Sequence, residues 1–66
     1  MSIPTTGETY SKLMEYLRKS QEESAMMSHL VRAQGDTELA DSWLKVSENF
    51  KRMQHSLTLL ATGRMH

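Results

Sequence analysis

Two apolar heptad patterns, one on each side of Gly35, restrict the possible fold of this chain more than any other feature. In residues 37–62, apolar side chains recur at alternating steps of four and three, the spacing of a helical stripe that packs against another helix. This stripe consists of Leu39, Trp43, Val46, Phe50, Met53, Leu57 and Leu60. The same spacing in residues 6–33 selects Tyr10, Leu13, Leu17, Ser20, Ser24, Met27 and Val31.

The two stripes face each other if the chain folds back at Gly35. In an antiparallel hairpin, residues at the same height have numbers with a constant sum. Each facing pair of the stripes adds to 70, from Val31 and Leu39 beside the turn to Tyr10 and Leu60 at the far end. We therefore predict an all-α fold, an antiparallel two-helix hairpin that turns at Gly35, with the two stripes as its coiled-coil seam.

Local signals place the ends of both helices. Thr5 and Glu8 have the spacing of a capping box, in which Thr5 caps the first helix. Gly35 can take the left-handed conformation that ends a helix, and Asp36 or Thr37 can cap the next one. The predicted organisation is a flexible tail at 1–5, a helix over about 6–33, a turn at 34–36, a helix over about 37–62 and a tail at 63–66.

Ser20 and Ser24 occupy seam positions where leucine or isoleucine is typical. In the predicted hairpin they lie opposite Phe50 and Val46, and small residues facing large ones let two helices interdigitate. A serine hydroxyl in a helix can also bond to the carbonyl four residues earlier. We interpret the serines as packing residues. The alternative is a polar groove that accepts a water or a partner's side chain.

Chain length indicates that the hairpin does not stand alone. A chain of 66 residues without cysteine has no disulfide to stabilise it, and such small scaffolds often oligomerise. Apolar residues outside the seam would supply the interface, and Ala40 and Ser47 join Leu44 in a shallow second stripe. We predict a homodimer or higher oligomer, a four-helix bundle in its simplest form. The expected interface with a second copy or another protein is Met14, Tyr16, Met26, Leu30, Leu44 and Leu59.

Motifs that carry chemistry are missing from the sequence. There is no Gly-x-Ser-x-Gly turn, and the three glycines are isolated, so no glycine-rich loop can hold phosphate. No Glu-x-x-His pair is present to supply the inward ligands of a carboxylate metal site. We expect no enzymatic activity, no cofactor and no metal. A metal-binding ferritin-like oligomer is the least favoured alternative.

The charge pattern bears on nucleic acid and on membranes. Eight basic residues balance eight acidic ones, and most of the basic side chains on the predicted helices have an acid four residues earlier. A phosphate-binding face normally carries an unneutralised basic cluster, so a nucleic-acid-binding four-helix bundle ranks second. These basic residues are Lys12, Arg18, Lys19, Lys45, Lys51 and Arg52. The longest apolar run is too short to span a bilayer, and the first ten residues do not resemble a secretory signal.

These observations favour a small cytoplasmic, non-catalytic helical module that associates with itself. An adaptor, a regulator or a co-chaperone would fit. Such a module would also bind another protein through an apolar helix face.

Overall fold

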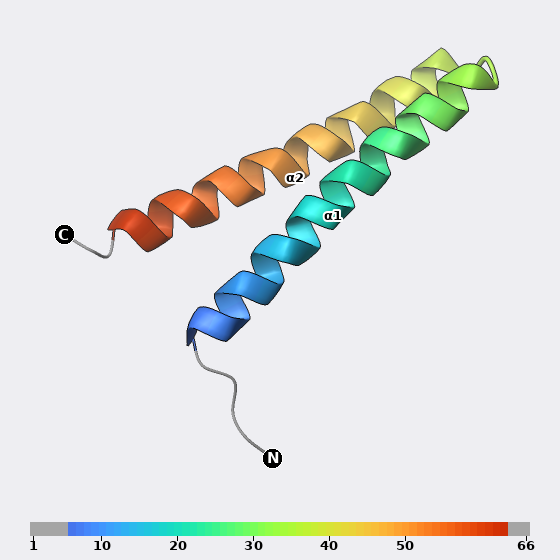
Figure 1. The fold of residues 1–66 in the computed structure, drawn as a ribbon. Coiled ribbons are helices and arrows are strands. Elements are labelled where there is room, and N and C mark those ends of the chain that lie inside the picture. Colours follow the sequence, from blue (N-terminus) through green and yellow to red (C-terminus); the bar gives the residue numbers. More distant parts are fainter. Residues whose placement is uncertain (1–5, 64–66) are drawn as a thin grey trace.

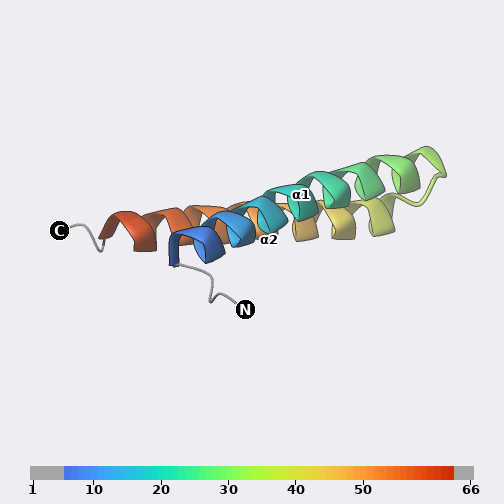
Figure 2. The same cartoon turned by 60° about the horizontal axis from the view of Figure 1, so that its bottom comes forward.

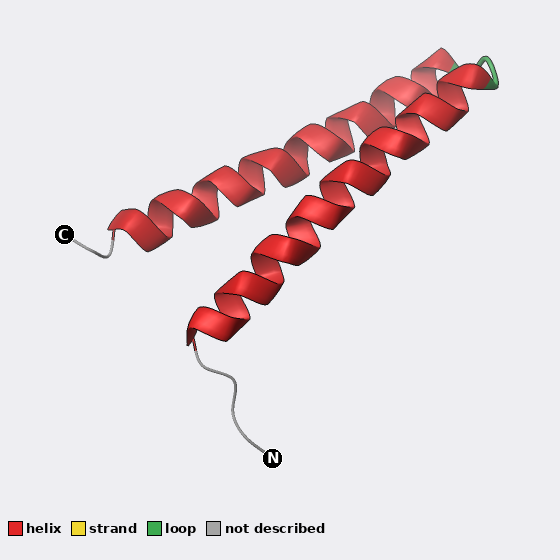
Figure 3. Cartoon of the chain, in the orientation of Figure 1, coloured by secondary structure: helices red, strands yellow, loops and turns green. Residues whose placement is uncertain are grey.

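The computed structural model describes residues 6–63, which form two antiparallel helices (Figure 1). Helix α1 spans Thr6–Ala33 and helix α2 spans Thr37–Gly63. Everything between the first and last described residues is helical except the short turn (Figure 3). The all-α hairpin predicted from the two stripes is confirmed.

The hairpin is a thin layer with the outline of a narrow V. The helices lie close together beside the turn and diverge toward their other ends (Figure 1). Turning the molecule shows both helices within a single layer (Figure 2). The smallest extent of the fold is 10 Å, which is the diameter of one helix with its side chains. A layer one helix thick leaves two broad faces uncovered.

Gly35 ends α1 and Asp36 begins α2. The glycine has a φ of 95°, in the left-handed region, and its N–H donates to the carbonyl of Arg32 at 3.0 Å. The N–H of Asp36 donates to the carbonyl of Val31 at 3.2 Å, which completes a Schellman motif. The Asp36 carboxylate then accepts the N–H of Leu39 at 3.0 Å and so caps α2. Of the two predicted caps, Asp36 therefore takes this role.

Three sequence predictions concern the chain ends. The predicted cap at Thr5 and the predicted tail at 1–5 lie outside the described residues. Residues 64–66 do so as well. Gly63, expected to follow the second helix, is the last residue of α2.

Replacing Gly35 with alanine is expected to destabilise the hairpin by about 1–2 kcal/mol, the cost of a left-handed backbone for a residue with a Cβ. A Cβ added at Gly35 meets nothing within 4 Å, so backbone strain is the only cost. Gly63→Ala is the matched control, because a Cβ there also meets nothing and the residue lies at a helix end. Urea unfolding followed by circular dichroism measures both variants. Equal unfolding free energies would contradict the left-handed turn.

The contact between the helices includes three predicted seam residues of α1, Leu17, Ser24 and Val31, but on α2 it is rotated away from the predicted seam. The buried residues are Leu17, Ser24, Ser28 and Val31 on α1, and Ala40 and Ser47 on α2. Five seam residues are half-buried: Tyr10, Ser20, Trp43, Phe50 and Leu57. The other six are exposed in the single chain: Leu13, Met27, Leu39, Val46, Met53 and Leu60. For these six, the prediction of a place inside the hairpin is wrong.

Small side chains explain the rotation. Ala40 is fully buried, and the Ser28 hydroxyl donates to its carbonyl oxygen at 2.7 Å. Two turns further along, the Ser47 hydroxyl donates to the carbonyl oxygen of Gln21 at 3.0 Å. Side chain to backbone bonds of this kind require a close approach of the two helices, which leucine or methionine at these positions would prevent. Where the helices begin to diverge, the longer Gln54 bridges to the Gln21 side chain at 2.6 Å.

Candidate protein-interaction surface

The side chains displaced from the predicted seam gather on one broad face of the hairpin. Three hollows between the helices open on this face. The one nearest the turn begins at half the height of the hairpin, and we call it the middle hollow. It has a volume of about 350 Å³ and is lined by Ser20, Met27, Trp43, Val46 and Phe50 among others. The hollows of the open half, of about 530 and 380 Å³, contain Leu13 and Met53 in one and Tyr10 and Leu60 in the other. Leu57 lines both of these, so the hollows form one continuous depression.

Helix periodicity extends this surface beyond the hollows. Residues seven apart lie on nearly the same line of a helix. Tyr16 and Leu30 are each seven residues from Glu23, which lines the middle hollow, and Leu39 is seven residues from Val46. We call this surface the apolar face. Its exposed members are Leu13, Tyr16, Met27, Leu30, Leu39, Val46, Met53 and Leu60.

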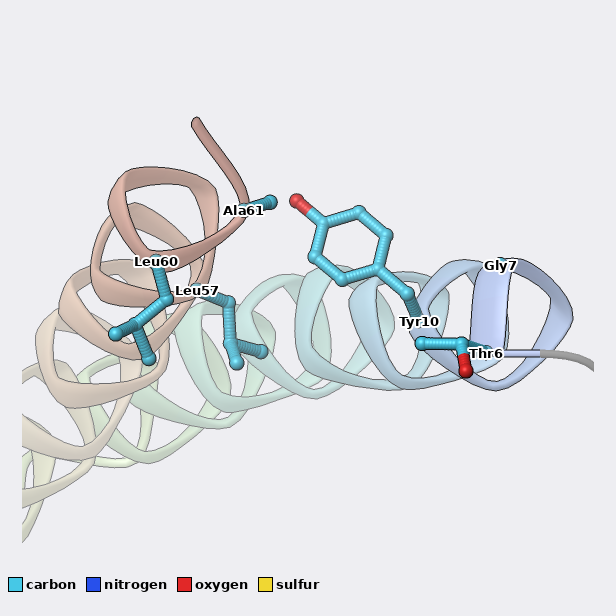
Figure 4. Close-up of a pocket in the computed structure, with 6 residues that line it drawn as sticks. All are labelled: Thr6, Gly7, Tyr10, Leu57, Leu60 and Ala61. Atoms are coloured by element: carbon cyan, nitrogen blue, oxygen red, sulfur yellow. The ribbon is translucent and has the colours of Figure 1, made fainter. Parts of the chain in front are cut away.

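Few charges interrupt the apolar face. Among the residues that line the three hollows, only Glu23 and Arg52 are charged. Half-buried Trp43, Phe50 and Leu57 form its floor. Figure 4 shows the hollow at the open end, where Tyr10 of α1 extends across the space between the helices toward Ala61 of α2. This surface offers large apolar side chains around a shaped depression, the features of a protein-binding patch.

The opposite side of the hairpin, the polar face, has a different composition. Arg32 of α1 and Asp41 of α2 form an ion pair at 3.0 Å across the two helices. Steps of seven from Arg32 lead to Ala25 and Arg18 along α1, and steps of seven from Asp41 lead to Glu48 and His55 along α2. Leu44, four residues from Ala40 and three from Asp41, is an isolated exposed leucine on this side.

The predicted interface residues are therefore divided between the two sides of the hairpin. Tyr16 and Leu30 lie on the apolar face. Met14 is half-buried, and Leu44 lies on the polar face. Met26 and Leu59 are exposed outside the apolar face. The stripe that Ala40 and Ser47 were expected to share with Leu44 is instead part of the contact between the helices.

The two serines of the predicted seam take part in packing. Ser24 is buried, and its hydroxyl donates to the carbonyl oxygen of Ser20 at 2.7 Å, the bond to the preceding turn expected from the sequence. Ser20 is half-buried in the middle hollow, which Phe50 also lines. Within residues 6–63, every buried side-chain nitrogen or oxygen has a hydrogen-bond partner. The serines thus leave no unsatisfied polar group in the contact between the helices.

Two of the basic side chains considered for nucleic-acid binding, Arg18 and Lys19, form ion pairs. Lys19 lies 3.4 Å from Glu15, as the sequence spacing predicts, and Arg18 lies 3.4 Å from Glu22. Both pairs are exposed, so each contributes little to stability. In each pair a carboxylate lies beside the positive charge with which a nucleic-acid phosphate would have to interact.

Sequence reasoning missed Gln21, Ser28 and Gln54 as contact residues. The signal was present, because Gln21 and Ser28 are seven residues apart on α1, as are Ala40, Ser47 and Gln54 on α2. Each helix thus carries a line of small or polar side chains directly beside its large apolar line.

Two further properties concern the described part of the chain as a whole. Nowhere in residues 6–63 do three histidine, aspartate or glutamate side chains come together to hold a metal ion. Over the same residues, neither helix contains a long enough apolar stretch to cross a lipid bilayer. Compared with protein-family models, with curated proteins and with solved structures, the chain matches none of them.

Proposed function

We propose that this chain is a small, non-catalytic interaction module that associates with itself, two hairpins packing apolar face to apolar face as a four-helix bundle. The observation that carries the proposal is the one-sided distribution of exposed apolar side chains. Of the eleven large apolar side chains that are exposed within residues 6–63, eight lie on the apolar face. A helical layer with one apolar and one polar face requires a second layer over the apolar one.

The exposed area is large enough for such an interface. A compact monomer of 7.6 kDa exposes about 4,300 Å². This chain exposes 5584 Å². The chain thus exposes about 1,300 Å² more than a compact monomer of its mass, and each side of a standard interface contributes roughly 800 Å². A second copy is the simplest partner, because a two-fold axis uses the same patch twice.

The hollows support docking rather than catalysis. They are open toward solvent and lined mostly by apolar side chains, whereas a catalytic cleft brings several polar groups to one point. Of the two serines that line the middle hollow, the buried one, Ser24, already donates its hydroxyl proton to the carbonyl of Ser20. Apolar depressions between exposed leucine and methionine side chains are suited to receive the side chains of another helix.

Sedimentation of the unmodified chain tests this proposal. We expect a mass near twice 7.6 kDa at micromolar concentrations, and a melting temperature that rises with protein concentration. The physical reason is that folding and association are coupled when a single hairpin has so little core. A monomer whose mass and melting temperature stay constant over a hundred-fold concentration range would remove the self-association.

A further inference from the structure

We infer that the two hairpins stack antiparallel, so that the turn of each copy covers the open end of the other. The two-fold axis would cross the apolar face near Ser20 and Phe50, at half the height of the hairpin. This inference rests on the proposed dimer and adds its geometry. It follows from the shape of the V and from the spacing of the exposed side chains.

The two halves of the apolar face differ in how much open space lies between the helices. In the open half the helices diverge, and the hollows of about 530 and 380 Å³ lie between them (Figures 1 and 4). In the half beside the turn the helices are in contact through Ser28 and Ala40. Exposed Met27, Leu39 and Val46 lie on the apolar face there, around one hollow of about 350 Å³. The open half therefore has two hollows with a combined volume more than twice that of the one hollow beside the turn.

Antiparallel stacking fits these halves together at both ends of the bundle at once. The side chains beside one turn enter the hollows of the other copy, and the two-fold axis repeats the arrangement. Parallel stacking instead places turn over turn and hollow over hollow, so that two hollows join into a larger void at one end. Protein interiors seldom contain voids of that size, because each loses the contacts of the side chains around it.

The spacing of the exposed side chains along each helix also matches itself when the second copy runs in the opposite direction. On α2, Leu39, Val46, Met53 and Leu60 are spaced by seven. Reversal about the middle of this line places Leu39 beside Leu60 of the second copy, and Val46 beside its Met53. On α1, reversal about Ser20 places Leu13 beside Met27 of the second copy. Large side chains then meet large ones on both helices, with the small Ser20 at the axis beside the bulky Phe50.

Cysteine crosslinking can read this orientation directly, because the natural sequence contains no cysteine. The double variant Leu39→Cys/Leu60→Cys changes two exposed positions, 46% and 65% accessible, and leaves the contact between the helices intact. The two positions are 21 residues apart on one helix. That separation is about 32 Å, so a disulfide from 39 to 60 must join two copies. Trypsin places the two cysteines in different peptides, because Lys45, Lys51 and Arg52 lie between them.

After mild oxidation and mass spectrometry, we expect the 39–60 peptide pair to be the dominant crosslink. Dominant 39–39 and 60–60 pairs would overturn the antiparallel arrangement, as would a dimer without crosslinks. Sedimentation of the reduced double variant runs in parallel. If the reduced variant and the unmodified chain are both monomeric, self-association itself is overturned. Failure of the antiparallel geometry is thereby distinguished from failure of the proposed function.

A spin-label distance provides a second measurement that needs no bond formation. With the single variant Leu39→Cys, antiparallel stacking separates the two labels by about 32 Å along the bundle, the height of 21 helical residues. Parallel stacking places both labels beside the two turns, at the same height. A dimer with a label distance clearly shorter than the antiparallel value would overturn the inference, and one near it would support it.

Discussion

Replacing Ala40 with leucine is expected to lower the free energy of unfolding by about 3 kcal/mol, the largest effect of any apolar exchange in the hairpin. Overpacking a filled contact typically costs about 1–3 kcal/mol. Loss of the hydrogen bond from Ser28 to the Ala40 carbonyl would cost a further ~1 kcal/mol of stability. Ala40 is 0% exposed, and this bond is 2.7 Å long, so three added carbon atoms cannot fit without separating the helices.

The matched control for this exchange is Ala25→Leu. Ala25 is exposed on the polar face, so the same three carbon atoms enter solvent there. Alanine and leucine are both strong helix formers, and we expect a change within about 0.5 kcal/mol. Thermal unfolding by circular dichroism should show a melting temperature lowered by more than about 10 °C for Ala40→Leu and nearly unchanged for Ala25→Leu. Similar melting of both variants would mean that the helices do not meet at Ala40 in solution.

The second large effect is expected from a charge on the apolar face. In the proposed dimer, Met53→Glu places two carboxylates between apolar side chains, and burying an unpaired charge is strongly unfavourable. We expect the dissociation constant to rise by at least about 100-fold, equivalent to ~2.7 kcal/mol. Helicity should fall at the same time, because the single hairpin has little core. Sedimentation equilibrium and circular dichroism at matched concentrations measure both changes.

Leu44→Glu is the control for this charge. Leu44 and Met53 are both on α2 and are similarly exposed, at 42% and 48%, but Leu44 lies on the polar face. The sequence pattern made Leu44 an expected interface residue, and the structure makes it the discriminating control. We expect Leu44→Glu to remain a helical dimer. Dissociation by Leu44→Glu, with a dimer retained in Met53→Glu, would move the second layer to the polar face.

Local chemistry was readable from the sequence because it depends on neighbouring residues. The helix bounds agree with the prediction to within one residue at the described ends. The left-handed Gly35 and the cap at Asp36 followed from glycine's freedom at positive φ and from the short carboxylate side chain. The heptad spacing also showed that α1 and α2 each have one apolar side. These properties need no knowledge of how closely the helices approach.

The rotation of the helices about their own axes was decided only by the tertiary structure. On α2 the large line of Leu39 and Val46 lies directly beside the small line of Ala40 and Ser47, so the spacing fits either line as the contact. Sequence reasoning chose the large one because burial of apolar area usually dominates. In the folded chain α2 makes its contact with α1 along the small line. Ser28 and Ser47 can reach the backbone of the neighbouring helix only when the two helices are this close. The large side chains are thereby left on the apolar face, where a second chain can bury them.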